Sequence, residues 1–78
     1  MIIRNGFIRD EDGDWHNLDY ISELRIKGLE NRGERNTFVV VADTKISDQE
    51  YVEEWMSKEF QSQHEAQINL DNLFGWAE

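Results

Sequence analysis

The strongest pattern of hydrophobic and polar positions lies near the C-terminus, where apolar residues recur at helical spacing. The residues of this stripe are Ala66, Leu70, Leu73 and Phe74. Ser62, followed three residues later by Glu65, forms a capping box in which each side chain meets a backbone N–H of the other residue. Gly75 stands where a helix commonly ends. The pattern therefore predicts one helix that begins at Ser62 and ends near Gly75.

Two segments in the middle of the chain predict β-strands. The β-branched run from Thr37 to Asp43 shows no alternation, which is typical of a central strand covered on at least one face. Residues 22–27 alternate polar with apolar, so we expect Leu24 and Ile26 to point inward. Residues 28–35 lie between these strands and hold two glycines and charges of both signs, which fits a hairpin loop.

The N-terminal residues predict shorter elements. Residues 1–9 resemble a short strand interrupted by Gly6. The acidic segment 10–14 predicts a turn in which Gly13 takes a positive φ. A hairpin from Phe7 to Leu18 would surround this turn, and residues 17–20 predict a local turn after it.

Residues 46–60 allow two interpretations. Ser47 and Glu50 form a second capping-box pattern, and apolar residues from Val52 to Phe60 would then cover one face of a helix. The alternative is a strand, with Val52, Met56 and Phe60 on one side and with Tyr51 and Trp55 on the other. We favour a strand antiparallel to residues 37–44, because a helix would leave almost no linker before Ser62.

These elements predict an α+β fold in a single domain that spans residues 1–78. The fold would be an antiparallel meander of three to four strands with one C-terminal α-helix packed across one face. A chain of 78 residues forms one small core of modest stability. It has no cysteine, so neither disulfides nor thiolate zinc sites are expected.

The net charge of −9 is unevenly distributed. Residues 10–23 hold six acids and no base, and residues 46–78 hold eight acids and only Lys58. Half of all basic residues fall between Arg25 and Arg35. Phosphate backbones and anionic lipids would repel such a chain, so we expect no direct nucleic-acid binding and no membrane binding. No signal peptide or membrane span is expected, and the cytoplasm is the default location.

Three parts of the chain carry a resemblance to known sequences. They are residues 15–21 (Trp-His-Asn-Leu-Asp-Tyr-Ile), the strand at 38–42 and the motif Phe60-x-Ser62-x-x-Glu65-Ala66-Gln67-x-x-Leu70-Asp71-x-Leu73. In this order they resemble a loose group of small uncharacterised bacterial proteins, many of them carried by prophages or conjugative elements. The resemblance implies a β-meander crossed by a C-terminal helix, and it implies no activity and no catalytic residues. The long stretch at 51–60 departs from the short strand that the group has before its Phe-x-Ser cap.

The residues that could carry chemistry favour plainer interpretations. Segment 10–14 is the nearest approach to a calcium loop, but the twelfth position from Asp10 is Ile21 instead of the required Glu. A solvated acidic turn is therefore favoured over a weak cation site. His64 has no second histidine at zinc-protease spacing, and His16 lies near carboxylates without a histidine partner. No serine has a nucleophile elbow. We expect no enzyme activity, no metal and no cofactor.

Aromatic residues are numerous for a fold with one face to bury them, so some must be partly exposed. Exposed Trp and Tyr surrounded by charge are typical of protein interfaces. The candidate contact residues are Asp12, Asp14, Trp15, Tyr51, Glu53, Trp55 and Trp76. One hypothesis is an interaction module or regulator whose protein partner carries basic charge, with a nucleic-acid mimic as its specialised form. The other is a structural domain that forms homodimers through an edge strand.

Overall fold

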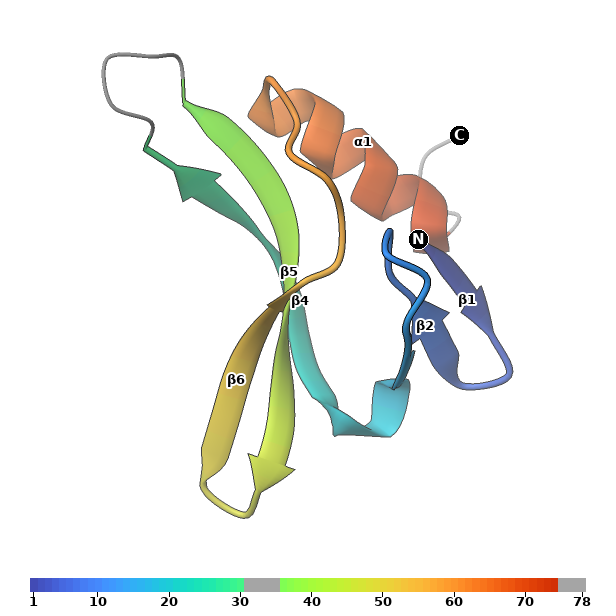
Figure 1. Cartoon of the computed structure of the whole chain (residues 1–78). Coiled ribbons are helices and arrows are strands. Elements are labelled where there is room, and N and C mark those ends of the chain that lie inside the picture. Colours follow the sequence, from blue (N-terminus) through green and yellow to red (C-terminus); the bar gives the residue numbers. More distant parts are fainter. Residues whose placement is uncertain (31–35, 75–78) are drawn as a thin grey trace.

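The computed structural model describes residues 1–30 and 36–74. Six strands form two antiparallel sheets of three strands each, and one helix follows them (Figure 1). The first sheet has the order β1 (Ile2–Arg4), β2 (Phe7–Arg9), β3 (Trp15–Asn17). A short 3₁₀ helix, η1 (Leu18–Tyr20), leads to the second sheet, which has the order β4 (Ile21–Leu29), β5 (Thr37–Ser47), β6 (Glu50–Trp55). The helix is α1 (Gln63–Phe74). The predicted α+β class with antiparallel meander connections and a C-terminal helix is confirmed, although the six strands form two sheets instead of one sheet of three to four strands.

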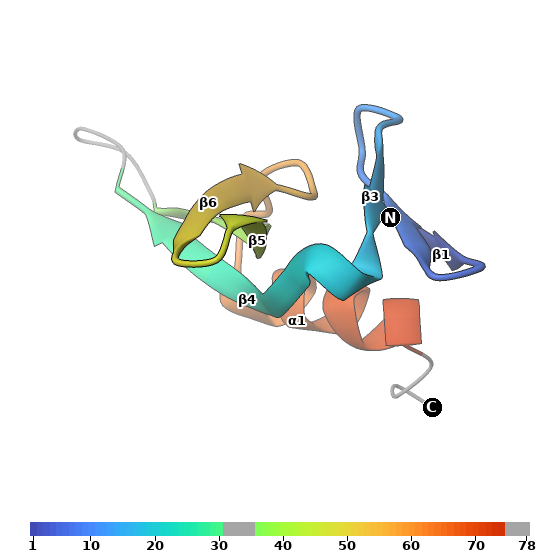
Figure 2. The same cartoon turned by 90° about the horizontal axis from the view of Figure 1, so that it is seen from below.

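Helix α1 begins where its sequence signal predicts. The Ser62 Oγ accepts the backbone N–H of Glu65 at 3.1 Å, which satisfies one of the free N–H groups of the first turn. Ala66 and Leu70 are buried, and α1 contacts β5, β4 and β1. Figure 2 shows the helix along one face of the second sheet, with its C-terminal end beside the first sheet. No helix within the described ranges is long and apolar enough to cross a membrane.

Strand β5 is the centre of the second sheet, as predicted. It pairs with β4 from Ile21↔Thr44 to Leu29↔Thr37, whereas β6 pairs only with its C-terminal half. The favoured strand interpretation of residues 46–60 is thus confirmed for β6, and the capping-box pattern at Ser47 lies in a hairpin with its turn at residues 48–49. The alternative interpretation of residues 46–60 as a helix is wrong, because cross-strand pairing with β5 overrides the local capping signal.

The strand predicted through Phe60 ends at Trp55, and Ser57 gives the reason. The backbone N–H of Met56 still donates to the carbonyl oxygen of Val40 at 2.8 Å. The backbone N–H of Val40, however, donates to the side-chain Oγ of Ser57 at 2.9 Å. Pairing resumes at Phe60, which exchanges two hydrogen bonds with Phe38. A side-chain oxygen thus replaces a backbone carbonyl in the ladder, and the chain between Met56 and Phe60 bulges away.

The first nine residues form a hairpin and not the single interrupted strand predicted from the sequence. Asn5 and Gly6 both have positive φ, +52° and +82°, which is the backbone of a two-residue type I′ turn. The register is Ile3↔Ile8 across this turn. The predicted hairpin that contains the acidic turn is confirmed, since β2 and β3 pair from Phe7↔Asn17 to Arg9↔Trp15.

The core lies between the second sheet, α1 and the inner face of the first sheet. Its buried members are Ile8, Val40, Ala42, Met56, Phe60, Ala66 and Leu70. Leu24 and Ile26 pack against this cluster as predicted. Val39 and Val41 are fully buried as well, on the opposite face of β5. Burial on both faces explains why the sequence of β5 shows no alternation.

Candidate functional site

The outer face of the second sheet, turned away from α1, carries a row of three candidate contact residues. Tyr51, Glu53 and Trp55 stand at every second position of β6 and therefore share one face. They pair with Lys45, Asp43 and Val41 of β5. Tyr51 is 52% exposed and Trp55 is 47% exposed. Aromatic surface and charge thus alternate along this strand.

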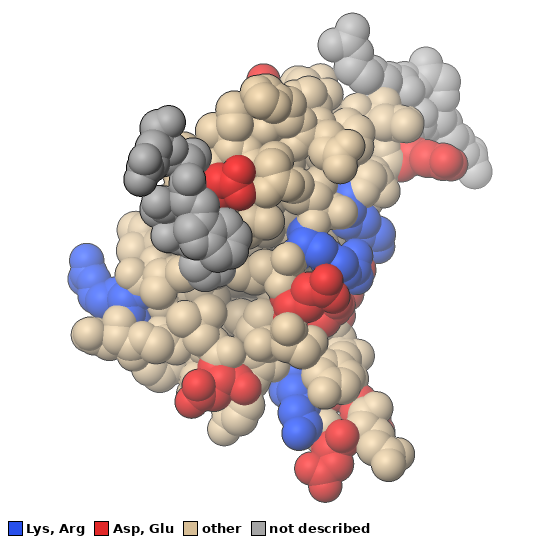
Figure 3. Space-filling view, turned by 180° about the vertical axis from the view of Figure 1, so that it is seen from behind, with Lys and Arg blue, Asp and Glu red and all other residues tan. Residues whose placement is uncertain are grey.

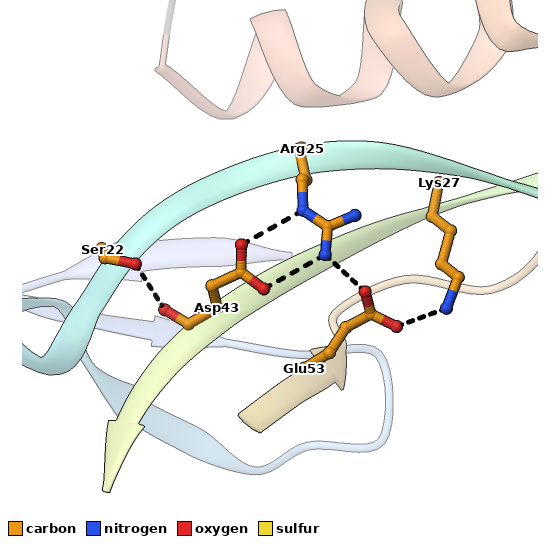
Figure 4. A network of polar contacts seen from close by, with 5 residues as sticks. All are labelled: Ser22, Arg25, Lys27, Asp43 and Glu53. Carbon is orange, nitrogen blue, oxygen red and sulfur yellow. Dashed lines mark hydrogen bonds and ion pairs between the residues drawn. The ribbon is translucent and has the colours of Figure 1, made fainter. Parts of the chain in front are cut away.

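A network of ion pairs lies beside this row (Figure 4). The Arg25 guanidinium contacts Asp43 through Nε and Nη2, at 3.1 and 3.2 Å, and Nη2 also bonds Glu53. Lys27 Nζ donates to the other oxygen of Glu53 at 2.6 Å. The network therefore joins β4, β5 and β6 across the sheet. Such an exposed network contributes little stability per pair, but it fixes the positions of its side chains.

The network determines the charge that Glu53 presents to solvent. Hydrogen bonds from Lys27 and then from Arg25 lower the pKa of Glu53, and hydrogen bonds to Asp43 and Glu53 raise the pKa of Arg25. Glu53 thus carries a negative charge that two cations offset. On the face shown in Figure 3, basic side chains at the right and at the bottom likewise lie beside acidic ones, whereas the basic group at the left edge has no acidic neighbour in this view.

The acidic turn at 10–14 is organised by Asp10, whose side chain is buried within it. Asp10 Oδ1 accepts the backbone N–H groups of Asp12 and Asp14, both at 2.9 Å. Gly13 has φ +94°, which a residue with a Cβ rarely adopts. The side chains of Asp12 and Asp14 are left exposed. Among residues 1–30 and 36–74, no group of three or more acids or histidines is arranged to hold a metal ion.

His16 links the acidic turn to the second sheet. Its Nε2 lies 2.7 Å from Asp10 Oδ2, and its Nδ1 lies 3.0 Å from Glu54 Oε2 of β6. Burial alone would raise the pKa of Asp10, but the His16 contact and the backbone N–H groups of Asp14 and Asp12 together lower it. Both ring nitrogens of His16 therefore lie against carboxylates. The Glu11 N–H also donates to Met56 O at 3.1 Å, so the turn is held beside the end of β6.

The outer face of the first sheet is a second surface, which sequence reasoning missed except for Trp15. It consists of Ile2, Arg4, Phe7, Arg9, Trp15 and Asn17. Phe7 is 43% exposed and Trp15 is 47% exposed. The signal that could have found this face is the Asn5–Gly6 turn, because it fixes the register and thereby the side of the sheet that each residue occupies.

The structure brings some of the seven candidate contact residues together and separates others. Tyr51, Glu53 and Trp55 form the row on β6, Asp12 and Asp14 lie in the acidic turn, and Trp15 lies on the outer face of the first sheet. Trp76 lies outside the described residues. Glu54, which sequence analysis grouped with Glu53 in one acidic region, lies on the other face of β6 against His16.

Comparisons with known proteins give no further indication of the site's role. No family model matches the chain, and no curated protein or solved structure shows significant similarity to it.

Proposed function

We propose that this chain is a non-enzymatic interaction module that binds a protein partner through exposed aromatic side chains. One observation carries the proposal. Four aromatic residues on the outer faces of the two sheets are between 43% and 52% exposed, namely Phe7, Trp15, Tyr51 and Trp55. Burying apolar area releases roughly 25 cal/mol per Å², so covering these side chains would favour association.

The chemistry around these side chains supports an interface. Trp and Tyr supply large contact area and are enriched among the residues that dominate binding energy. Trp55 and Tyr51 flank Glu53, which the pairs with Arg25 and Lys27 hold in place. A fixed polar group between two aromatic side chains offers a partner both apolar area and directional contacts.

The polar residues nearest to a catalytic arrangement have structural partners, which supports the non-enzymatic part of the proposal. Both nitrogens of His16 lie against carboxylates. The Ser57 hydroxyl accepts the Val40 N–H and donates to Lys58 O. The Ser62 hydroxyl caps α1. Exposed acidic groups outside the two outer faces, such as Asp12 and Asp14, would attract basic groups elsewhere on the partner's surface and raise its association rate.

The test is affinity capture from a bacterial lysate at low and high salt, using the full chain and two surface variants. We expect wild type to retain a stoichiometric protein, and we expect Trp15→Ser or Trp55→Ser to lose it. Lys58→Gln serves as the matched control, because Lys58 is exposed and follows β6 without belonging to a strand of either sheet. Retention of the same proteins by wild type and both serine variants would contradict the proposal.

Sedimentation separates this function from self-association. An interaction module is expected to remain a monomer at the concentrations used for capture. A concentration-dependent dimer that both serine variants abolish would favour the structural, self-associating alternative instead.

A further inference from the structure

The outer face of the first sheet differs in charge from the rest of the molecule. Its residues form two cross-strand rows, Ile2–Arg9–Trp15 and Arg4–Phe7–Asn17. The row between them, Ile3–Ile8–His16, points to the opposite side, where Ile8 is fully buried. The two outer rows therefore hold two arginines and no acid, on a chain whose net charge is −9.

Neither arginine of this face has an ion-pair partner among residues 1–30 and 36–74. Arg4 and Arg9 form no ion pair with any residue in the described part of the chain, whereas Arg25 and Lys27 on the second sheet are both paired. Arg9 lies against the acidic turn, since a Cβ on Gly13 would be 3.3 Å from its Nη2. Arg4 lies at the other end of the sheet, beside the Asn5–Gly6 turn. An unpaired guanidinium presents its donors in the geometry that binds a carboxylate through two hydrogen bonds.

Next to Arg4 the face is hollowed. A shallow hollow of about 380 Å³ is lined by Arg4, Asn5, Phe7 and Trp15. Its volume is enough for one or two large side chains, and its walls combine two aromatic rings with one free cation. Cross-strand pairing holds Arg4 opposite Phe7. Trp15 on β3 pairs with Arg9 and therefore lies diagonal to Phe7 on the same face. The hollow is built on strands, so its side chains are held in register.

We propose that this hollow is the docking site for an acidic protein segment, which places an apolar side chain between Phe7 and Trp15 and a carboxylate on Arg4. This assignment rests on the proposed interaction function and specifies the surface and the partner's chemistry. Charge complementarity selects the occupant, since the face carries no anion and two cations that form no ion pair within the described part of the chain. Two copies of this face would bring arginine against arginine, which disfavours a symmetric dimer through it. An acidic segment needs only one carboxylate contact, with Arg4, so the acidic remainder of the chain opposes it less than it opposes nucleic acid, which would need several phosphate contacts.

The test is a selection of short random peptides against the immobilised full chain, followed by binding of the selected peptides as fluorescein conjugates. We expect the selected sequences to be enriched in Asp or Glu next to Trp, Phe or Leu. Their affinity should fall about tenfold on Arg4→Gln and on Phe7→Ser, which is the loss typical of an interface anchor. Arg4 is exposed on an edge strand, so Arg4→Gln keeps the assay informative if Phe7→Ser is unstable.

Two matched controls assign the surface. Lys45→Gln removes an exposed cation from the second sheet, and Tyr20→Ser removes a 58% exposed aromatic ring from η1, outside both outer faces. Neither should change the affinity. If Tyr51→Ser abolishes binding and Phe7→Ser does not, the first sheet is not the docking site, although the proposed function survives. Selected peptides that are basic, or that bind the Arg4→Gln variant as tightly as wild type, would also overturn the assignment.

The remaining outcomes decide between partner classes. A fluorescein-labelled thymidine oligonucleotide that binds more tightly than the peptides, with the same dependence on Phe7, would show that the partner class is wrong. If the full chain selects no peptide and captures no cellular protein, both the docking site and the proposed interaction function fail.

Discussion

At the scale of single residues, three serine hydroxyls of this chain satisfy backbone groups. Ser62 caps α1, Ser57 replaces a carbonyl in the β5 ladder, and Ser22 donates to Asp43 O at 3.2 Å. The two Ser-x-x-Glu patterns, at Ser62 and Ser47, have the same sequence signal and different structures. The local sequence favours a helix cap, and tertiary contacts such as strand pairing determine whether the cap forms.

Ser62→Ala should destabilise the fold by about 1 kcal/mol, because the Glu65 N–H loses its acceptor at the helix start. Ser47→Ala changes the same pattern within a hairpin, and its effect should stay within about 0.5 kcal/mol. Urea unfolding of both variants measures the free energies. Equal losses for the two variants would contradict the assignment of Ser62 as the cap.

Asp10 gives the fold a pH dependence with a defined sign. Its pKa is lower in the folded chain than its ordinary value of 3.8, so the ionised form favours the fold. This contribution is fully present above the ordinary pKa and is lost as the pH falls through the folded value. Asp10→Asn keeps an oxygen for the Asp12 and Asp14 N–H groups but removes the charge that meets His16.

We therefore expect Asp10→Asn to be less stable than wild type at neutral pH, by about 1 kcal/mol. The difference should shrink as the pH falls below about 4, where the carboxylate of the unfolded chain becomes protonated, and should vanish once the pH falls through the lower pKa of the folded chain. Unfolding free energies across this range measure both effects, with Asp12→Asn as a control in the same turn. The same pH profile for the Asp10 and Asp12 variants would contradict this role of Asp10.

At the scale of elements, the sequence predicted those parts that are long or have a local start signal. Helix α1 has a cap and an apolar stripe, and β5 has a continuous β-branched run. The strands of the first sheet are only three residues long, too short for a period of two to be read, and the Asn5–Gly6 turn was the one signal that divided residues 1–9. The end of β6 depends on where the Ser57 side chain points, which no periodicity predicts.

The candidate site was less predictable than the fold, because exposure depends on register. Sequence reasoning identified Trp15, Tyr51 and Trp55 as candidates, and it could not place Phe7 or Arg4 on the same face as Trp15. Nor could it show that Glu53 is paired with Arg25, which is 28 residues away in the chain. Such contacts arise only when β4, β5 and β6 are aligned.

The Asn5–Gly6 turn sets the register of the first sheet and hence its outer face. Gly6→Ala should cost about 1 kcal/mol, because a Cβ is unfavourable at positive φ even though no atom lies within 4 Å of it. At Gly28 a Cβ would make ordinary contact with Phe38 at 3.6 Å, so Gly28→Ala should change stability by less than about 0.5 kcal/mol. Thermal unfolding compares the two, and an equal effect would contradict the turn assignment.

At the scale of the whole molecule, the outer faces of the two sheets differ in their local charge, although the net charge is strongly negative. On the outer face of the second sheet, acids and bases neutralise one another beside Tyr51 and Trp55. On the outer face of the first sheet, Phe7 and Trp15 lie beside two arginines that form no ion pair with the residues that the structure describes. The His16 contact with Glu54 joins the two sheets, and one buried cluster includes residues of both. The acidic remainder of the chain acts at longer range, on solubility and on encounter rates.

The most direct test of the interaction proposal is hydroxyl-radical footprinting of the full chain, alone and in the complex recovered by capture. Oxidation of Phe7 and Trp15 should fall several-fold in the complex, while Tyr20, which is 58% exposed on η1, should be oxidised equally in both states. Unchanged oxidation of all four aromatic residues, Phe7, Trp15, Tyr51 and Trp55, would contradict the claim that exposed aromatic side chains form the contact surface.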